Sequence, residues 1–153
     1  MGKLKRPSWD DYFLKLAIVV SKRSNCIRRQ VGAVMVQGKH IIATGYSGTP
    51  TGITNCSDGG CKRCLSRAKN TLKENERKDL CICLHAEENA ILQSAYHGAT
   101  TKGATLYSIT APCLQCTKSL INAGIGRVVF AKTYKDDLGI KLLKRAAVVV
   151  IRF

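Results

Sequence analysis

Residues 85–131 decide the fold, and they read HAEENAILQSAYHGATTKGATLYSITAPCLQCTKSLINAGIGRVVFA. This stretch alternates helical and strand patterns, which cover in order residues 85–97, 104–109, 113–123 and 127–131. Gly98 and Gly124 close the two helical patterns, as glycine commonly does after a helix C-terminus. Such alternation predicts a largely parallel sheet with helices packed against it.

The residues on both sides of this stretch extend the same pattern. Ser8 is a suitable N-cap for an apolar helix, and Gly38-Lys39-His40 between two β-rich runs predicts a hairpin. The elements expected outside the central stretch are a helix up to Ser24, strands over 31–37 and 41–46, a helix over 135–145 and a strand over 146–153. At 153 residues, the chain is expected to form a single α/β domain over residues 1–153.

The cysteine content points to metal binding more than to disulfides. There are 8 cysteines, and the basic N-terminus is not followed by the apolar stretch of a secretory signal. The compartment expected by default is therefore the cytoplasm, with the nucleus as the alternative, and thiols stay reduced in both. A membrane is excluded as a partner because no apolar run approaches about 18 residues.

The chain is strongly basic. Its 25 Lys and Arg against 10 Asp and Glu give a net charge of +15. Such an excess attracts anions: nucleotide phosphates, nucleic acid or both. A basic surface that is merely solvated is an equally weighted interpretation at this point.

Two short motifs carry the chemistry. His85-Ala86-Glu87 opens one predicted helix, and Pro112-Cys113-Leu114-Gln115-Cys116 opens the next. Together they form the H-x-E…P-C-x-x-C pattern that is typical of zinc deaminases. One imidazole and two thiolates give zinc three protein ligands and leave a fourth position for water, which indicates a catalytic ion. The positive ends of two helices would favour thiolate at this point.

Glu87 is the predicted catalytic residue. It lies two positions from His85 and is not itself expected to bind zinc. Zinc lowers the pKa of its water from about 15.7 to about 7, and a carboxylate beside it can act as general base and then as general acid. Attack of water at C4 of a cytosine base would then give uracil and ammonia.

Weaker readings of the same motifs remain open. A lone C-x-x-C also occurs in redox pairs and in structural zinc sites. A polynucleotide deaminase that flips a cytosine or adenine out of a nucleic acid is the main alternative function, and the basic charge favours it. A non-catalytic zinc scaffold is the third, although it would have no need for Glu87.

Six stretches resemble the deoxycytidylate (dCMP) deaminase family of the cytidine deaminase superfamily. They are residues 6–10 (RPSWD), 30–34 (QVGAV), 44–50 (TGYSGTP), 85–91 (HAEENAI), 103–107 (GATLY) and 121–125 (INAGI). The resemblance implies a three-layer fold: a mixed five-stranded sheet with helices on both faces. It also implies conversion of dCMP to dUMP, with dCTP as a further substrate to consider. Homohexamers, activation by dCTP and inhibition by dTTP are common in the family.

The resemblance also implies nucleotide contacts. By the motif match, Asn89 and the loop over residues 45–50 are expected to contact the nucleotide. Within that loop the expected contacts are Ser47 and Gly48. The family usually has Asn where this chain has Ser47. Because serine is shorter and offers one hydroxyl, sugar recognition or effector binding is in question at this position.

A cysteine-rich segment at about residues 47–84 interrupts the succession of predicted helices and strands. A loop this long in a compact domain usually has a function or is held in place by additional contacts. Some relatives carry a second zinc that ties such a loop to the first helix. The quartet predicted from the resemblance is Cys26, Cys56, Cys61 and Cys81, as a closed structural site. Cys64 and Cys83 are alternates, and the Cys61-x-x-Cys64 spacing favours Cys64. Buried thiols without metal, or an occasional disulfide, are the remaining alternative.

Overall fold

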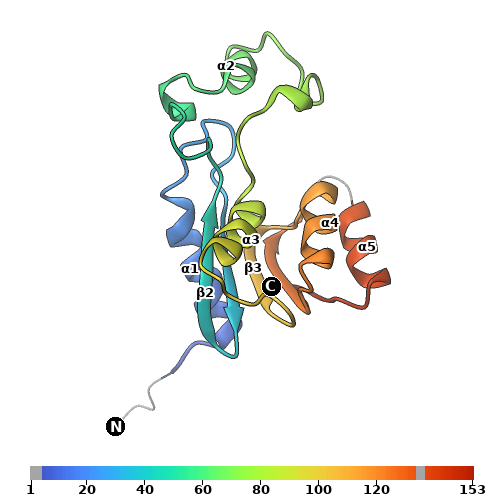
Figure 1. Cartoon of the computed structure of the whole chain (residues 1–153). Helices are drawn as coiled ribbons and strands as arrows, with labels where there is room; N and C mark the ends of the chain where they lie inside the picture. The colour runs from blue at the N-terminus through green and yellow to red at the C-terminus, as the bar shows by residue number, and fades with distance from the viewer. Residues whose placement is uncertain (1–4, 134–136) are drawn as a thin grey trace.

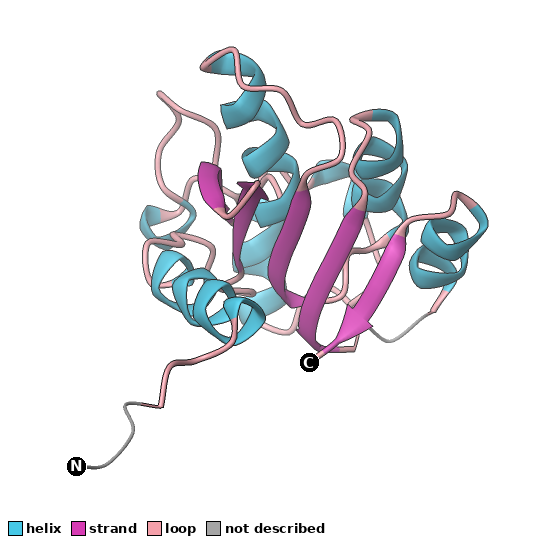
Figure 2. Ribbon diagram, turned by 90° about the horizontal axis from the view of Figure 1, so that it is seen from below, coloured by secondary structure: helices cyan, strands magenta, loops and turns pink. Residues whose placement is uncertain are grey.

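The fold is a mixed five-stranded sheet with helices on both faces, as expected (Figure 2). A computed structural model describes residues 5–133 and 137–153. The strands are β1 (Gly32–Gln37), β2 (His40–Tyr46), β3 (Thr105–Thr110), β4 (Arg127–Lys132) and β5 (Val149–Arg152). The helices are α1 (Trp9–Ser21), α2 (Lys62–Ala68), α3 (Ala86–Tyr96), α4 (Leu114–Asn122) and α5 (Leu138–Arg145) (Figure 1). The helix expected from residue 135 begins at Leu138, and residues 135 and 136 lie outside the described ranges.

The sheet has the order β2-β1-β3-β4-β5. Strand β1 is antiparallel to both β2 and β3, whereas β3, β4 and β5 run parallel. Gly38 and Lys39 form the turn of the β1–β2 hairpin, and both have positive φ (51° and 68°), as two-residue hairpin turns of type I′ require. The parallel half follows from helices α4 and α5, which connect β3 to β4 and β4 to β5, because parallel neighbours need a connection that crosses over the sheet.

Each face of the sheet has its own core. Helix α1 covers one face, where Phe13, Leu14 and Ala17 pack against Val34 and other apolar residues of the sheet. Helices α3, α4 and α5 cover the opposite face through residues that include Ala90, Leu120 and Leu143. Alternate residues of β3 therefore serve different cores: Leu106 packs on the α3–α4 side and Tyr107 on the α1 side.

Helix α3 lies very close to strand β2 because of a glycine. A Cβ built on Gly45 would lie 2.1 Å from the carbonyl oxygen of Ala86 and 2.4 Å from the amide nitrogen of Ala90. Both are backbone atoms of α3, so only glycine allows this approach. This contact fixes the start of α3, where the His85-Ala86-Glu87 motif lies.

The cysteine-rich segment is the part that projects from the fold (Figure 1). It was expected to be irregular, and that expectation was wrong for Lys62–Ala68, which forms α2. Two short 3₁₀ helices, Cys56–Asp58 and Lys78–Leu80, accompany it. The bonds that close the outer end of the segment come from arginines: Arg63 donates to the carbonyls of Glu74 and Glu76, and Arg67 to that of Leu72.

Candidate active site

Two helix N-termini bring the three predicted zinc ligands together. His85 is the N-cap of α3 and Cys113 is the N-cap of α4, with Cys116 in the first turn of α4. Nδ1 of His85 lies 3.5 Å from the sulfur of Cys113 and 3.3 Å from that of Cys116. Parallel strands β3 and β4 set the position of α4 beside α3, so residues far apart in sequence meet here.

This arrangement fits a zinc ion. Tetrahedral zinc with Zn–S bonds of about 2.3 Å and Zn–N bonds of about 2.0 Å places its sulfur and nitrogen ligands about 3.5 Å apart. The two measured separations agree with that value. The exposed His85 and the buried Cys116 show that the group spans from the surface into the interior, so a substrate could reach the fourth position.

Glu87 faces this group from inside the protein. Its side chain is only 3% exposed, and the sulfur of Cys116 lies 3.9 Å from its Oε2. The hydroxyl of Ser108 donates a 3.0 Å hydrogen bond to its Oε1. A carboxylate held in this way is placed to exchange protons with a ligand at the metal position.

Ser108 is a site residue that the sequence analysis missed. It is fully buried in β3, on the same face as Leu106. The available signal was a small polar residue within a strand that is otherwise buried. Such a residue needs a hydrogen-bond partner, and the partner here is the carboxylate of Glu87.

Close contacts within the group and burial shift the protonation of these residues. A hydrogen bond with Cys116 lowers the pKa of Cys113 to about 3, so this sulfur is a thiolate. A hydrogen bond with Cys113 raises the pKa of His85 to about 9. Burial raises the pKa of Glu87. Zinc requires thiolates and a neutral imidazole, so its binding would release the proton held by His85.

The three predicted nucleotide-contacting residues lie where β2 ends beside α3: Ser47 and Gly48 follow β2, and Asn89 is in α3. The amide of Asn89 donates to the carbonyl of Tyr46 over 2.7 Å. Gly48 forms a reciprocal pair of backbone bonds with Leu84. A cavity of about 300 Å³ lined by Lys22, Arg23 and Tyr46, among others, lies close to this point, and its two cations would suit an anionic ligand.

Ser47 is committed to the protein itself. The residue is buried, and its hydroxyl accepts from the amide of Val31 and donates to the carbonyl of Arg29. Ser24 also contacts this hydroxyl, over 2.8 Å. These partners use the capacity of one hydroxyl, so a nucleotide contact by this side chain would require one bond to be exchanged.

The remaining six cysteines lie together: five are in the projecting segment, and Cys26 is in the loop between α1 and β1. All are free thiols, and their sulfurs fall into two groups of four in which every sulfur lies within 4.8 Å of the others. One group is Cys26, Cys56, Cys64 and Cys83; the other is Cys61, Cys64, Cys81 and Cys83. The structure thus divides the predicted quartet between the groups and gives the two alternates, Cys64 and Cys83, to both.

Contacts among these thiols shift their protonation. Contact with Cys83 is the main cause that lowers the pKa of both Cys26 and Cys81. Burial raises the pKa of Cys56 and Cys64. Cys83 therefore lies beside Cys26, which belongs only to the first group, and beside Cys81, which belongs only to the second.

Imidazole, two thiolates and a buried glutamate at two helix N-termini define a class: the zinc-dependent deaminases of nucleobases, in which a glutamate that is not a ligand moves the protons. The comparisons with known proteins narrow this class. A family model described as the cytidine and deoxycytidylate deaminase zinc-binding region matches residues 7–132.

Relatives with assigned names agree with the family model. The chain is 45% identical to deoxycytidylate deaminase of Saccharomyces cerevisiae over its whole length, and 48% identical to that of Schizosaccharomyces pombe over 96% of it. It covers 47% and 44% of those proteins, so it spans about half the length of the curated relatives that it matches. The solved dCMP deaminase of cyanophage S-TIM5 with dCMP and dUMP has a TM-score of 0.78 and 30% identity, covering 98% of this chain and 100% of that one. The chain belongs to the cytidine and deoxycytidylate deaminase family.

Proposed function

We propose that this chain catalyses the hydrolytic deamination of dCMP to dUMP, as one domain over residues 1–153, and so supplies pyrimidine deoxynucleotides. The observation that carries the proposal is the buried carboxylate of Glu87, whose Oε2 lies 3.9 Å from the sulfur of Cys116 within the His85–Cys113–Cys116 group. The names of the yeast relatives and the nucleotides bound to the cyanophage enzyme support the choice of substrate.

In this proposal Nδ1 of His85 and the sulfurs of Cys113 and Cys116 hold the catalytic zinc. Bound zinc supplies a Lewis acid that lowers the pKa of a water molecule to about 7. The helix N-termini at His85 and Cys113 favour the negative charge of the thiolates. The buried side of the group excludes bulk water from the reacting atoms, which strengthens every electrostatic contact there.

Glu87 moves the protons. It accepts one from the attacking water and delivers it to N3 of the cytosine ring as the oxygen bonds to C4. It then transfers the second proton of that oxygen to the exocyclic amine, and ammonia leaves as the carbonyl of uracil forms. Burial raises the pKa of Glu87 above its ordinary value, which favours the protonated form that the carboxyl takes between its two proton transfers.

A single assay tests the substrate. The protein is incubated in parallel with cytidine, dCMP, dCTP and a single-stranded DNA oligonucleotide, and the uracil product of each is quantified. The proposal expects the highest kcat/KM for dCMP, with dCTP as the other nucleotide to compare. Turnover of the oligonucleotide alone would overturn it.

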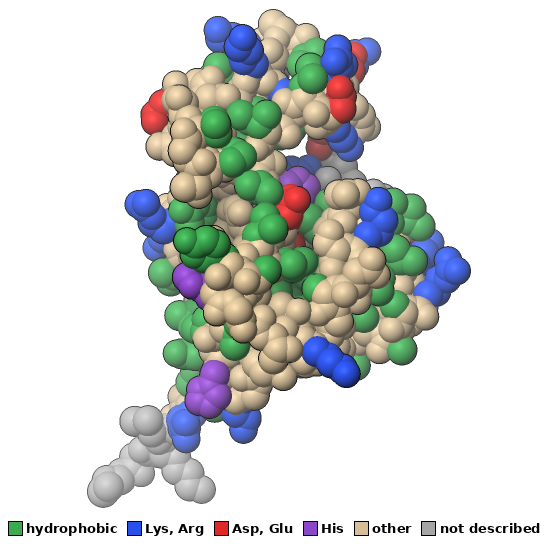
Figure 3. Space-filling view, in the orientation of Figure 1, with side chains coloured by type: hydrophobic (Ala, Val, Ile, Leu, Met, Phe, Trp, Pro, Cys, Tyr) green, Lys and Arg blue, Asp and Glu red, His purple; other side chains and the backbone are tan. Residues whose placement is uncertain are grey.

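The oligonucleotide arm addresses the alternative of polynucleotide deamination. The net charge of +15 favours that alternative, and Figure 3 shows Lys and Arg side chains over the projecting segment and over the α4–α5 side. Against it, the relatives that cover the whole chain carry names of a mononucleotide deaminase. We assign the basic surface to solvation and to attraction of nucleotide phosphates.

The finer expectations from the family resemblance complete the proposal. They are a second, structural zinc held by the cysteine-rich segment, a homohexamer, activation by dCTP, inhibition by dTTP, and a cytoplasmic location. Assembly is supported by exposed apolar side chains on α1, of which Ile18 is 48% and Val19 58% exposed. None of the described helices is long and apolar enough to cross a membrane. Sedimentation with and without dCTP tests the assembly.

A further inference from the structure

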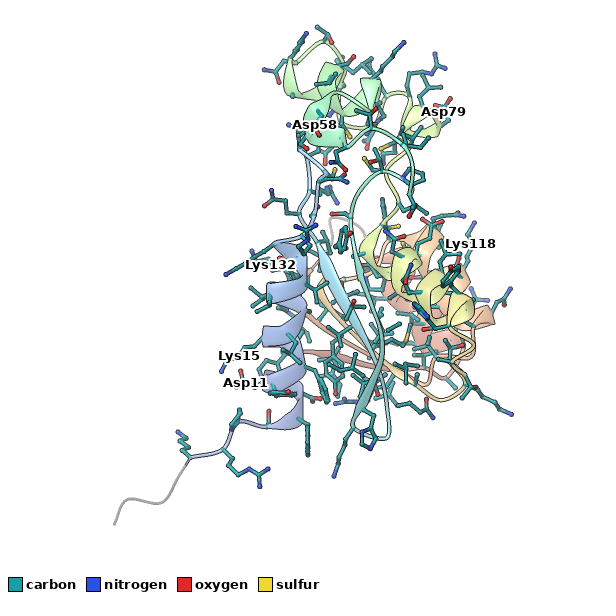
Figure 4. All side chains as sticks on the ribbon, turned by 60° about the vertical axis from the view of Figure 1, so that its left-hand side comes forward. Asp11, Lys15, Asp58, Asp79, Lys118 and Lys132 are labelled. Atoms are coloured by element: carbon teal, nitrogen blue, oxygen red, sulfur yellow. The ribbon has the colours of Figure 1, made fainter. Side chains whose placement is uncertain are left out.

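The projecting segment has no apolar core of its own. The buried residues that cluster there are all cysteines, Cys26, Cys56, Cys61 and Cys64, with Cys81 and Cys83 packed against them. Larger apolar side chains of the same segment point to solvent: Ile53, Leu80 and Ile82 are 51%, 51% and 42% exposed. Figure 4 shows sulfur atoms gathered below the labelled Asp58 and Asp79 of this segment. Four buried and two half-buried thiols alone would not offset the entropy of ordering so long a segment.

The sulfur separations match those of zinc ligands. Tetrahedral zinc with Zn–S bonds of about 2.3 Å places its sulfurs about 3.8 Å apart. Cys64 lies 3.9 Å from both Cys81 and Cys83, and Cys61 lies 4.0 Å from Cys81. A disulfide would instead bring two sulfurs to about 2.05 Å. These four sulfurs are therefore spaced as ligands and not as oxidised pairs, and those of Cys26, Cys56, Cys64 and Cys83 also lie within 4.8 Å of one another.

The two groups of four share one edge. Cys64 and Cys83 belong to both groups, whereas Cys26 and Cys56 belong only to the first and Cys61 and Cys81 only to the second. One tetrahedral ion uses four sulfurs, so a single zinc would leave two of the six clustered thiols without a role. Two ions that share the Cys64 and Cys83 sulfurs use all six, with four sulfurs each.

We propose that the six cysteines hold a binuclear zinc cluster, in which the sulfurs of Cys64 and Cys83 bridge the two ions. Cys26 and Cys56 complete the first ion, and Cys61 and Cys81 complete the second. The cluster joins the loop after α1 to three parts of the projecting segment and replaces its missing apolar core. Together with the catalytic ion, the chain then binds three zincs.

The charge of the cluster suits its surroundings. Six thiolates and two Zn²⁺ ions leave a net charge of −2. The segment over 47–84 has seven basic and four acidic side chains, so its own net charge opposes that of the cluster. Binding releases the thiol protons, which makes loading of the cluster favoured by rising pH.

The test is the number of zincs that each variant retains, measured by native mass spectrometry and by elemental analysis of the full chain. The wild type is expected to hold three. Cys26→Ser and Cys61→Ser are each expected to hold two, because each removes a ligand of one ion. Cys64→Ser and Cys83→Ser are expected to hold one, because each removes a bridge. Ser57→Ala, in the same segment, is the matched control and should hold three.

A second measurement leaves all six cysteines of the proposed cluster in place. X-ray absorption at the zinc edge of the Cys113→Ser variant, which lacks a ligand of the catalytic ion, should show sulfur-rich zinc with a zinc neighbour at roughly 3 Å, since two Zn–S bonds of about 2.3 Å meet at each bridge. Two zincs in the wild type, or a Cys61→Ser variant that holds as many as the wild type, would overturn the cluster. The cluster proposal rests on the proposed metal role of the segment, with two structural zincs in place of one. Zinc counts that contradict the cluster would not contradict the proposed function, because dCMP turnover is assayed separately.

Discussion

Arg127 donates two hydrogen bonds to the carboxylate of Asp10, although 117 positions separate the two residues: Nη2 lies 2.7 Å from Oδ2, and Nη1 lies 2.8 Å from Oδ1. The hydroxyl of Tyr107 donates to the same carboxylate over 2.8 Å. The group fastens the first turn of α1 to strands β3 and β4. Both charged side chains are largely shielded, with 28% and 22% of their surface exposed, so this ion pair is stronger than one on the surface.

The first prediction concerns this pair. Asp10→Asn should lower the free energy of unfolding by about 2 kcal/mol, because hydrogen bonds to charged groups are lost. The matched control is Asp11→Asn, which removes another acid from the same helical turn but only the exposed contact with Lys15, for an expected loss of under about 1 kcal/mol. Equal losses in urea denaturation would contradict the role given to Arg127.

The same pair predicts a pH dependence of stability. Hydrogen bonds from Arg127 lower the pKa of Asp10 below its ordinary value. Its contribution is therefore fully present above the unfolded pKa of about 3.9, and it is lost as the pH falls through the lower folded pKa. The difference between wild type and Asp10→Asn should be constant near neutral pH and shrink as the pH falls below about 4. Denaturation curves from pH 7 downward test this.

The second prediction concerns the proton carrier. Glu87→Gln removes the carboxylate but keeps the shape of the side chain, so zinc content should be unchanged while kcat falls by about 10²–10⁴-fold. Glu88→Gln removes the same charge one residue further along and should retain most of the activity. A Glu87→Gln variant with wild-type turnover and wild-type zinc would contradict the mechanism.

The third prediction assigns a positioning role to Ser108. Without its hydrogen bond the carboxylate of Glu87 is less well fixed, so Ser108→Ala should lower kcat about 10-fold, equivalent to about 1.4 kcal/mol. KM for dCMP should change little, because Ser108 is buried behind Glu87. Ser94→Ala is the control: it removes another buried hydroxyl, which bonds to the carbonyl of Ala90 within α3. A loss of stability without a change in kcat in both variants would make Ser108 merely structural.

The order of helices and strands could be predicted because it depends on local sequence patterns. Ser8 caps α1 through the amide of Asp11, over 3.1 Å, and Gly98 and Gly124 adopt positive φ after α3 and α4. These features depend on neighbours within a few residues. The short α2 was missed because its seven residues carry no clear apolar period, and its position depends on distant contacts such as that of Arg63 with Glu74.

The residues of the candidate site also divide into those that local patterns predict and those that depend on distant contacts. Two short motifs contain His85, Glu87, Cys113 and Cys116. Because both motifs were expected to begin helices, the sequence could predict that these side chains lie close together. Ser108 could not be predicted, because its partner lies on another element. For the six other cysteines, spacing along the chain did not indicate which sulfurs approach one another. The turns of the projecting segment decide that, and they place Cys64 and Cys83 at the centre.

The last prediction tests how close packing positions the metal group. Gly45→Ala and Gly32→Ala are matched changes on opposite faces of the sheet: each new Cβ would lie 2.1 Å from a carbonyl oxygen, that of Ala86 in α3 or that of Ala17 in α1. Both variants should lose about 1–3 kcal/mol of stability, since backbone must shift in each. Only Gly45→Ala displaces the first turn of α3, next to His85 and Glu87. It should therefore also lower kcat per folded molecule at least about 10-fold, as small displacements of catalytic groups do. Gly32→Ala should keep wild-type kcat where it is folded. Equal kcat values in the two variants, measured at a temperature where denaturation curves show both folded, would contradict the idea that the β2–α3 contact sets the geometry of the site.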